Sequence, residues 1–303
     1  MADPTLNYVL CPDATGGRRM AYWQWGDATA GHVIVCAHGL SRQGRDFDVL
    51  AQALVEISGG TVRVICPDVV GRGLSDWLQD PTQYQVPTYA ADMLAMLAQL
   101  RPTTLDWLGT SMGGLIGIGV CSALGAAAAQ AGAGLVVRKL VLNDVGPAIE
   151  WESIVRIGTY LGRNMEFESL QAAADAMWAI STSFGPHTPQ QWLELSRHMV
   201  KPRSDGQPGV RLHYDPAIAV GVRAVTAEGA AQGEAMLWYL YDTITAPTLL
   251  LRGADSDLLA PATAQLMTQR GPQARLVEFA GVGHAPTLMA TDQIDAVASF
   301  LLD

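Results

Sequence analysis

Short apolar runs alternate with amphipathic stretches between residues 32 and 143, and this alternation limits the chain to few folds. The apolar runs are typical of strands buried on both faces of a parallel sheet, and they are His32–Ala37, Thr61–Cys66, Leu105–Leu108 and Lys139–Asn143. Amphipathic helices are predicted between them, from about Asp46, from Thr88 and after Ser111. The pattern predicts a doubly wound parallel sheet with right-handed crossovers.

The alternation stops after residue 147 and returns near residue 248. Two apolar runs before residue 32 and two after residue 247 are also expected to be strands. They are Asn7–Leu10, Met20–Trp25, Thr248–Arg252 and Arg275–Phe279. The predicted fold is therefore α/β, with a mostly parallel eight-stranded sheet and a helical lid inserted after the sixth strand. We expect a core in two parts, 1–147 and 241–303, and a lid over 148–240.

The predicted lid contains no convincing buried strand in its sequence. Segment 201–216 is rich in Pro, Gly and Asp and is expected to be a loop. The lid is rich in aromatic residues, which suits either a cover over a pocket or a hydrophobic core of its own.

Composition excludes several classes of partner. The 303 residues carry a net charge of −10 without a Lys/Arg cluster, which argues against nucleic acid and anionic membrane surfaces.

Met1–Thr5 shows no signal-peptide pattern, and no apolar run is long enough to predict a membrane span, so a cytoplasmic location is expected. The four cysteines are expected to be buried free thiols, with a Cys36–Cys66 bridge less favoured.

The stretch Gly109-Thr110-Ser111-Met112-Gly113 follows a predicted strand and opens a predicted helix. Such a turn has no room for side chains beside it, so glycines flank the serine and its hydroxyl is exposed above the sheet. Ser111 is the candidate nucleophile. The turn also directs the N–H of Met112 toward whatever binds there.

A serine nucleophile needs a base and a carboxylate that orients the base. His284, in a glycine-rich loop after the last strand, is the best candidate base, whereas His38 is expected to make a structural hydrogen bond. Three aspartates end strands in the required chain order. Asp257 is preferred because Pro261 begins a helix four residues later, and Asp255 and Asp144 remain open.

Acyl transfer also needs donors for the developing oxyanion. The backbone N–H groups of Leu40 and Met112 are the candidates, which leaves both side chains free to be apolar and to line a pocket.

These motifs together resemble the α/β-hydrolase fold superfamily, of the lidded serine esterase, lactonase and carbon–carbon hydrolase type. The similar segments are His38-Gly39, Pro67-Asp68 with Gly71-Arg72-Gly73-Leu74-Ser75, the turn around Ser111, the loop ending at Asp257, and Gly283-His284. The resemblance implies an oxyanion loop, a structural loop, the nucleophile, the acid and the base, in that order. The chain departs from the pattern in its acid loop, which carries two aspartates and runs one residue longer between Gly253 and Asp257.

The leading hypothesis is a hydrolase that cleaves a small-molecule carboxylic ester through an acyl-enzyme, with no metal and no cofactor. The same triad could instead cleave a lactone or the carbon–carbon bond of a vinylogous diketone from aromatic degradation. Those anionic substrates would need a cation in the pocket, for which the candidates are Arg42, Arg45, Arg156 and Arg163. A third possibility is a non-catalytic ligand receptor on the same fold. The natural substrate, the packing of the lid and the oligomeric state stay open.

Overall fold

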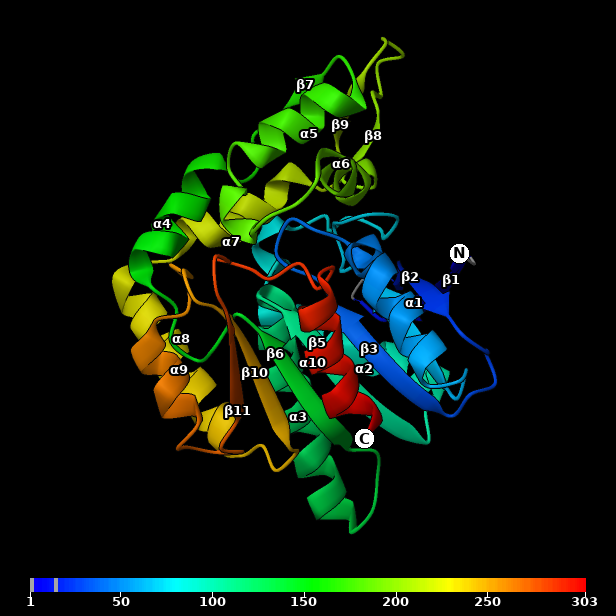
Figure 1. Ribbon diagram of the computed structural model, residues 1–303, viewed down its shortest axis with the longest axis vertical. Coiled ribbons are helices and arrows are strands. Elements are labelled where there is room, and N and C mark those ends of the chain that lie inside the picture. The colour runs from blue at the N-terminus through cyan, green and yellow to red at the C-terminus, as the bar shows by residue number, and fades with distance from the viewer. Residues whose placement is uncertain (1–2, 14–15) are drawn as a thin grey trace.

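The computed structural model describes residues 3–13 and 16–303, so the first two residues of the Met1–Thr5 stretch lie outside it. Its main feature is a sheet of eight strands in the order β1-β2-β4-β3-β5-β6-β10-β11 (Figure 1). The strands are β1 Thr5–Cys11, β2 Arg18–Trp25, β3 His32–Ala37, β4 Val62–Pro67, β5 Thr104–Thr110, β6 Val137–Asn143, β10 Thr248–Gly253 and β11 Arg275–Phe279.

The sheet is mostly parallel. Strand β2 pairs antiparallel with both β1 and β4, and every pair from β4 to β11 is parallel. The predicted α/β class with a mostly parallel eight-stranded sheet is confirmed. The carboxyl ends of β3, β5, β6 and β10 lie along the same edge of this sheet, so the loops that follow these strands are neighbours.

Helices cover both faces of the sheet. On one face, α1 and α10 enclose an apolar cluster with the sheet, and on the other face α2, α3, α8 and α9 enclose a larger one. Their bounds are α1 Asp48–Ile57, α2 Val86–Leu100, α3 Met112–Ala131, α8 Ala227–Asp242, α9 Pro261–Met267 and α10 Thr291–Leu302. Two short 3₁₀ turns, η1 Gly44–Phe47 and η2 Pro81–Gln83, precede α1 and α2.

Helix α3 is apolar along most of its length. Among the described residues it is the one helix long and apolar enough to cross a membrane, judged by length and composition only, and 44% of that stretch is buried. In this fold α3 packs against β5, α2 and α8. The four cysteines are buried with free thiols, as expected.

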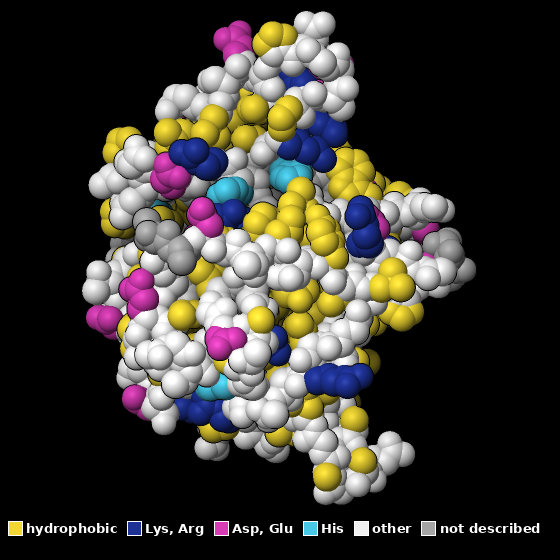
Figure 2. Space-filling model, turned by 90° about the vertical axis from the view of Figure 1, so that its right-hand side faces the viewer, with side chains coloured by type: hydrophobic (Ala, Val, Ile, Leu, Met, Phe, Trp, Pro, Cys, Tyr) yellow, Lys and Arg dark blue, Asp and Glu magenta, His cyan; other side chains and the backbone are white. Residues whose placement is uncertain are grey.

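The chain between β6 and α8 lies above the carboxyl ends of the strands (Figure 1). Before α8 its elements are α4 Trp151–Tyr160, β7 Glu166–Phe167, α5 Leu170–Trp178, η3 Thr182–Phe184, α6 Pro189–Arg197, β8 Val200–Pro202, β9 Val210–Leu212, η4 Pro216–Ile218 and α7 Ala219–Ala224. We call residues 148–226 the insertion. Figure 2 shows it as the narrower upper part of the molecule, above the wider core.

The insertion is not wholly helical. Strands β7, β9 and β8 form a small antiparallel sheet, and two of them lie within the segment that was expected to be loop. These strands are only two or three residues long, and none is fully buried, so they lack the apolar run that marks a strand in sequence. The helices of the insertion begin at capping residues: Ser169 caps α5, and Thr188 forms a capping box with Gln191 at α6.

The aromatic residues of this region divide between two cores. Trp192 packs in the insertion's own apolar cluster, with Trp178 and Phe184 against it. Trp238 and Tyr241, near the end of α8, belong to the main core instead, and the Tyr241 hydroxyl donates to the carbonyl of Met267. Helix α8 thus crosses the predicted boundary at residue 240 and packs on the sheet, while the division of the chain into 1–147, 148–240 and 241–303 stays a prediction.

Candidate active site

Ser111 lies in the turn between β5 and α3, in a backbone conformation that residues other than glycine rarely adopt. Its φ is 52° and its ψ is −119°. A Cβ on Gly109 would lie 2.2 Å from the carbonyl oxygen of Gly113, and a Cβ on Gly113 would lie 2.0 Å from that of Ala37. Both glycines are therefore required by close packing, and the turn leaves the serine side chain facing the cavity described below.

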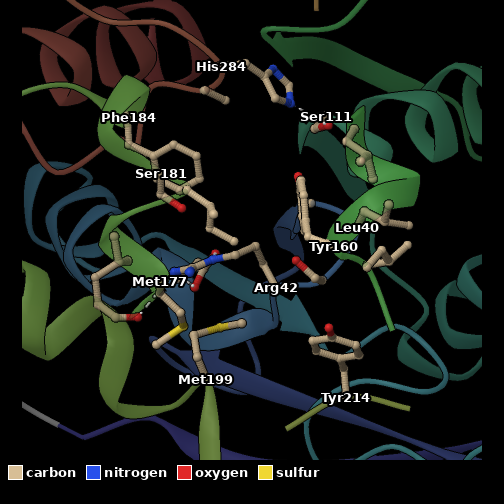
Figure 3. A pocket seen from close by; sticks show the side chains of 18 of the residues that line it. Leu40, Arg42, Ser111, Tyr160, Met177, Ser181, Phe184, Met199, Tyr214 and His284 are labelled. Atoms are coloured by element: carbon tan, nitrogen blue, oxygen red, sulfur yellow. Dashed lines mark hydrogen bonds and ion pairs between the residues drawn. The ribbon is translucent and has the colours of Figure 1, made fainter. Parts of the chain in front are cut away.

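The imidazole of His284 lies between Ser111 and an aspartate. Its Nε2 is 2.9 Å from the Ser111 Oγ, and its Nδ1 is 2.7 Å from Oδ2 of Asp144. Figure 3 shows the His284 ring directed at Ser111 across the top of the cavity. Because an ionised carboxylate only accepts, Nδ1 carries the proton in the neutral ring and Nε2 accepts from the serine hydroxyl.

The expected pairing of Asp257 with His284 is wrong. The side chain of Asp257 is 55% exposed and forms an ion pair of 2.6 Å with Arg156 of α4. Asp255 is also exposed and does not reach the imidazole. The structure instead brings Asp144, one of the two alternatives left open, to the histidine.

Asp144 is fully buried at the end of β6 and is held by the loop that follows β10. Its Oδ1 accepts from the backbone N–H of Gly253 at 2.9 Å, and its Oδ2 accepts from the Ser256 hydroxyl at 2.6 Å. Its own N–H donates to the carbonyl of Leu251. Hydrogen bonds from neutral donors stabilise the ionised carboxylate in a buried place and fix its orientation.

The order of the strands in the sheet explains why Asp144 reaches His284. Strand β6 is the direct neighbour of β5, and the N–H of Ser111 donates to the carbonyl of Asn143 at 2.9 Å. The residue after Asn143 is thus one strand away from the nucleophile, whereas the β10 loop is two strands away. The φ of 56° at Asp144, which few residues other than glycine, Asn and Asp tolerate, turns its side chain back toward that strand end.

The loop after β3 lies beside Ser111. A Cβ placed on Gly39 would be 3.8 Å from the Ser111 Cβ, and Leu40 lines the same cavity as Ser111. Met112 is the first residue of α3, where backbone N–H groups have no partner within the helix. The residues of the two expected backbone donors, Leu40 in the loop after β3 and Met112 at the start of α3, thus both lie beside the serine.

Arg72 contacts both Leu40 and Met112. Its guanidinium is fully buried, donates to the carbonyls of Leu40 and Val70, and lies 3.6 Å from the sulfur of Met112. The sequence marked this segment as structural only, and the structure shows that the arginine connects the loop after β3 to the start of α3.

His38 has the structural role expected of it. Its Nε2 accepts from the N–H of Val69, and its Nδ1 donates to the carbonyl of Gly39 at 2.7 Å. Burial lowers the pKa of His38 to about 3, so the ring is neutral and holds the loops after β3 and β4 together.

A cavity of about 270 Å³ opens in front of Ser111 and His284. Its floor comes from the loops at the sheet edge, and its walls come from the insertion, including Tyr160, Met177 and Phe184 (Figure 3). Most lining side chains are apolar. Arg42 reaches into it from the loop after β3 and forms a bidentate ion pair with Asp46. Burial raises the pKa of Asp46, and the Arg42 guanidinium opposes that shift.

The insertion makes hydrogen bonds to the loop that carries His284 and to the loop after β3. On the histidine side, the carbonyl of Ser183 accepts from the N–H of Gly283 at 2.5 Å, and the Ser183 hydroxyl donates to the carbonyl of His284 at 3.2 Å. On the opposite side, Arg42 donates to the carbonyl of Leu195, and Gln43 donates to that of His198.

No group of three or more His, Cys, Asp and Glu side chains within residues 3–13 and 16–303 is arranged to hold a metal ion. The lining of the cavity supplies one imidazole, one carboxylate and three guanidinium groups. These groups suit recognition of polar or anionic organic molecules.

Comparisons with known proteins identify the family of this chain. The chain is 46% identical to a 3-hydroxybutyrate-oligomer hydrolase of Cupriavidus necator, over 99% of this chain and 98% of that protein. It is 24% identical to a pimeloyl-[acyl-carrier protein] methyl ester esterase of Xanthomonas campestris pv. campestris, over 87% and 92% of the two chains.

A solved alpha/beta hydrolase from Novosphingobium aromaticivorans superposes with a TM-score of 0.81 at 34% identity, over 99% of both chains. Residues 34–299 match the sequence profile of the alpha/beta hydrolase family. The chain therefore belongs to the alpha/beta hydrolase family and is an enzyme of the hydrolase class.

Proposed function

We propose that this protein hydrolyses carboxylic esters through an acyl-enzyme on Ser111, and that its substrates are oligomers of 3-hydroxybutyrate. The observation that carries the proposal is the hydrogen-bonded line from the Ser111 hydroxyl through His284 to the buried carboxylate of Asp144. This arrangement gives a serine the adjacent, oriented base that it needs to act as a nucleophile.

The first half of the reaction forms the acyl-enzyme. The Ser111 Oγ attacks the ester carbonyl while Nε2 of His284 takes its proton, and Asp144 stabilises the imidazolium through Nδ1–H. The oxyanion of the tetrahedral intermediate accepts hydrogen bonds from the N–H groups of Leu40 and Met112. Collapse breaks the bond to the alcohol oxygen, which leaves with the proton from His284.

The second half repeats these steps with water. His284 removes a proton from water, the resulting hydroxide attacks the acyl carbon, and the same N–H groups stabilise the second oxyanion. Return of the proton to the Ser111 Oγ releases the carboxylic acid. Each turnover thus consumes one ester and one water and yields one alcohol and one acid, with no cofactor needed for the balance.

The substrate assignment rests on the relative from Cupriavidus necator, which matches this chain nearly end to end. Oligomers of 3-hydroxybutyrate are linear esters of short, methyl-branched units. The apolar walls of the cavity suit such units, and about 270 Å³ suits a short chain.

The decisive test replaces the nucleophile. Ser111→Ala should lower kcat on the 3-hydroxybutyrate dimer and trimer by about five to six orders of magnitude, because the base then has no hydroxyl to activate. Released 3-hydroxybutyrate is measured by chromatography, and the thermal unfolding midpoint should match that of the wild type. Ser181→Ala is the matched control, since Ser181 lines the same cavity but lies away from His284 (Figure 3).

Two results would contradict the proposal at different levels. Full turnover by Ser111→Ala would reject the mechanism. Hydrolysis of p-nitrophenyl butyrate without hydrolysis of either oligomer would reject the substrate and keep the mechanism.

A further inference from the structure

The cavity in front of Ser111 differs in charge from the protein around it. The whole chain carries a net charge of −10, yet three arginines line the cavity and only one carboxylate does. The arginines are Arg42, Arg156 and Arg163, and the carboxylate is Asp46. Such a local excess of positive charge attracts anions to a site that the rest of the surface would repel.

Two of these arginines already have carboxylate partners. Arg42 is paired through two nitrogens with Asp46, and its side chain is only 12% exposed. Arg156 is paired with Asp257, whose carboxylate is not part of the lining. A second carboxylate, such as that of a substrate, would bind less strongly to either guanidinium, because each charge is already compensated.

Arg163 is different. It follows α4 in the turn after that helix, and its Nε donates to the carbonyl of Thr159 at 2.9 Å. Among the side chains that the structure describes, no carboxylate lies within ion-pair distance of its guanidinium. The residue is exposed and also lines the cavity, so it lies where the cavity meets solvent.

We propose that Arg163 forms a carboxylate-binding site at the mouth of the cavity and binds the free acid end of the substrate while an ester carbonyl of the same molecule lies at Ser111. This inference rests on the proposed function and adds the end of the oligomer that is recognised. A planar guanidinium pairs with a carboxylate through two parallel hydrogen bonds, which fixes the direction of the chain as well as its position.

The test compares two substrates that differ only at that end. One is the 3-hydroxybutyrate dimer with its free carboxylate, and the other is the same dimer with a terminal primary carboxamide, which has nearly the same shape and no charge. Arg163→Gln should raise KM for the free acid by about tenfold or more, since a charged hydrogen bond is lost. Its kcat should stay within about twofold of the wild type, and its KM for the carboxamide should not change.

The control and a salt series separate site binding from general charge. Arg197 lies on the insertion, outside the cavity lining and paired with Glu194, so Arg197→Gln makes the same charge change elsewhere and should leave both substrates unaffected. In the wild type the preference for the free acid should weaken as ionic strength rises, because an exposed ion pair is screened. Arg163→Gln should lose that salt dependence.

A binding measurement keeps the inference testable without turnover. Calorimetric titration of Ser111→Ala with the two dimers should show tighter binding of the free acid, and Ser111→Ala combined with Arg163→Gln should abolish the difference. Equal effects of Arg163→Gln on both dimers, or none on either, would overturn the carboxylate site. Absence of turnover by the wild type would reject the proposed function alone, since the titration would still report on Arg163.

Discussion

The carboxyl ends of β6 and β10 look alike in sequence but differ in structure. Each strand is buried and parallel, and each is followed by an aspartate within a few residues. At the end of β6, Asp144 is fully buried and hydrogen-bonded to His284. At the end of β10, Asp257 is exposed and paired with an arginine of the insertion.

The difference shows that the two loops together place one carboxylate beside His284. The loop after β6 carries the carboxylate, and the loop after β10 supplies the donors, Gly253 N–H and Ser256 Oγ, that hold it. A buried carboxylate needs such donors to stay ionised, so the β10 loop remains part of the site although its own aspartates point elsewhere. Three substitutions test this division, and their expected effects decrease in the order given.

Asp144→Asn should have the largest effect. An amide cannot hold the proton on Nδ1 of His284 as a carboxylate does and cannot stabilise the imidazolium, so kcat should fall by about four orders of magnitude. Initial rates on the 3-hydroxybutyrate dimer, with the substrate saturating, measure this loss. A fall of less than about tenfold would mean that another group orients the histidine.

Ser256→Ala should have an intermediate effect. It removes one of the two hydrogen bonds that the β10 loop donates to Asp144 and leaves the carboxylate itself in place. We expect kcat to fall by about tenfold, with KM little changed, because loss of one neutral hydrogen bond costs about 1 kcal/mol. Ser256→Thr keeps a hydroxyl and serves as the rescue variant. If alanine and threonine lowered kcat equally, packing rather than the hydrogen bond would be responsible.

Asp257→Asn should have the smallest effect. Its exposed ion pair with Arg156 contributes about 1 kcal/mol or less to stability, and the side chain does not contact His284. We expect kcat within about twofold of the wild type. A loss comparable to that of Asp144→Asn would reverse the comparison and restore Asp257 as the catalytic acid.

Local pattern made the nucleophile and the base predictable from sequence. Gly109, Ser111 and Gly113 form a short turn with a recognisable spacing between a strand and a helix, and His284 follows the last strand in a glycine-rich loop. The continuous apolar runs likewise predicted β3, β4, β5 and β6, which are buried along most of their length.

The catalytic acid was not predictable from local pattern, because which aspartate reaches His284 depends on which strands are neighbours in the sheet. Asp144 and Asp257 satisfy the same chain order, and only the pairing of β6 with β5 places one of them beside the serine. The small sheet of β7, β8 and β9 was missed for a related reason, since its strands are held by pairing with one another rather than by burial. The contacts of Arg72 with Leu40 and Met112 also join segments that are distant in sequence.

The two hydrogen bonds between Ser183 and the backbone of Gly283 and His284 have a consequence for the working cycle. Any outward swing of the insertion large enough to admit a bulky molecule would pull on the segment that bears the imidazole. A polymer too long to be enclosed would then keep the insertion in its outward position and would displace His284 from its place beside Ser111. The proposed hydrolysis would therefore favour chains short enough to be enclosed, without any residue dedicated to measuring length.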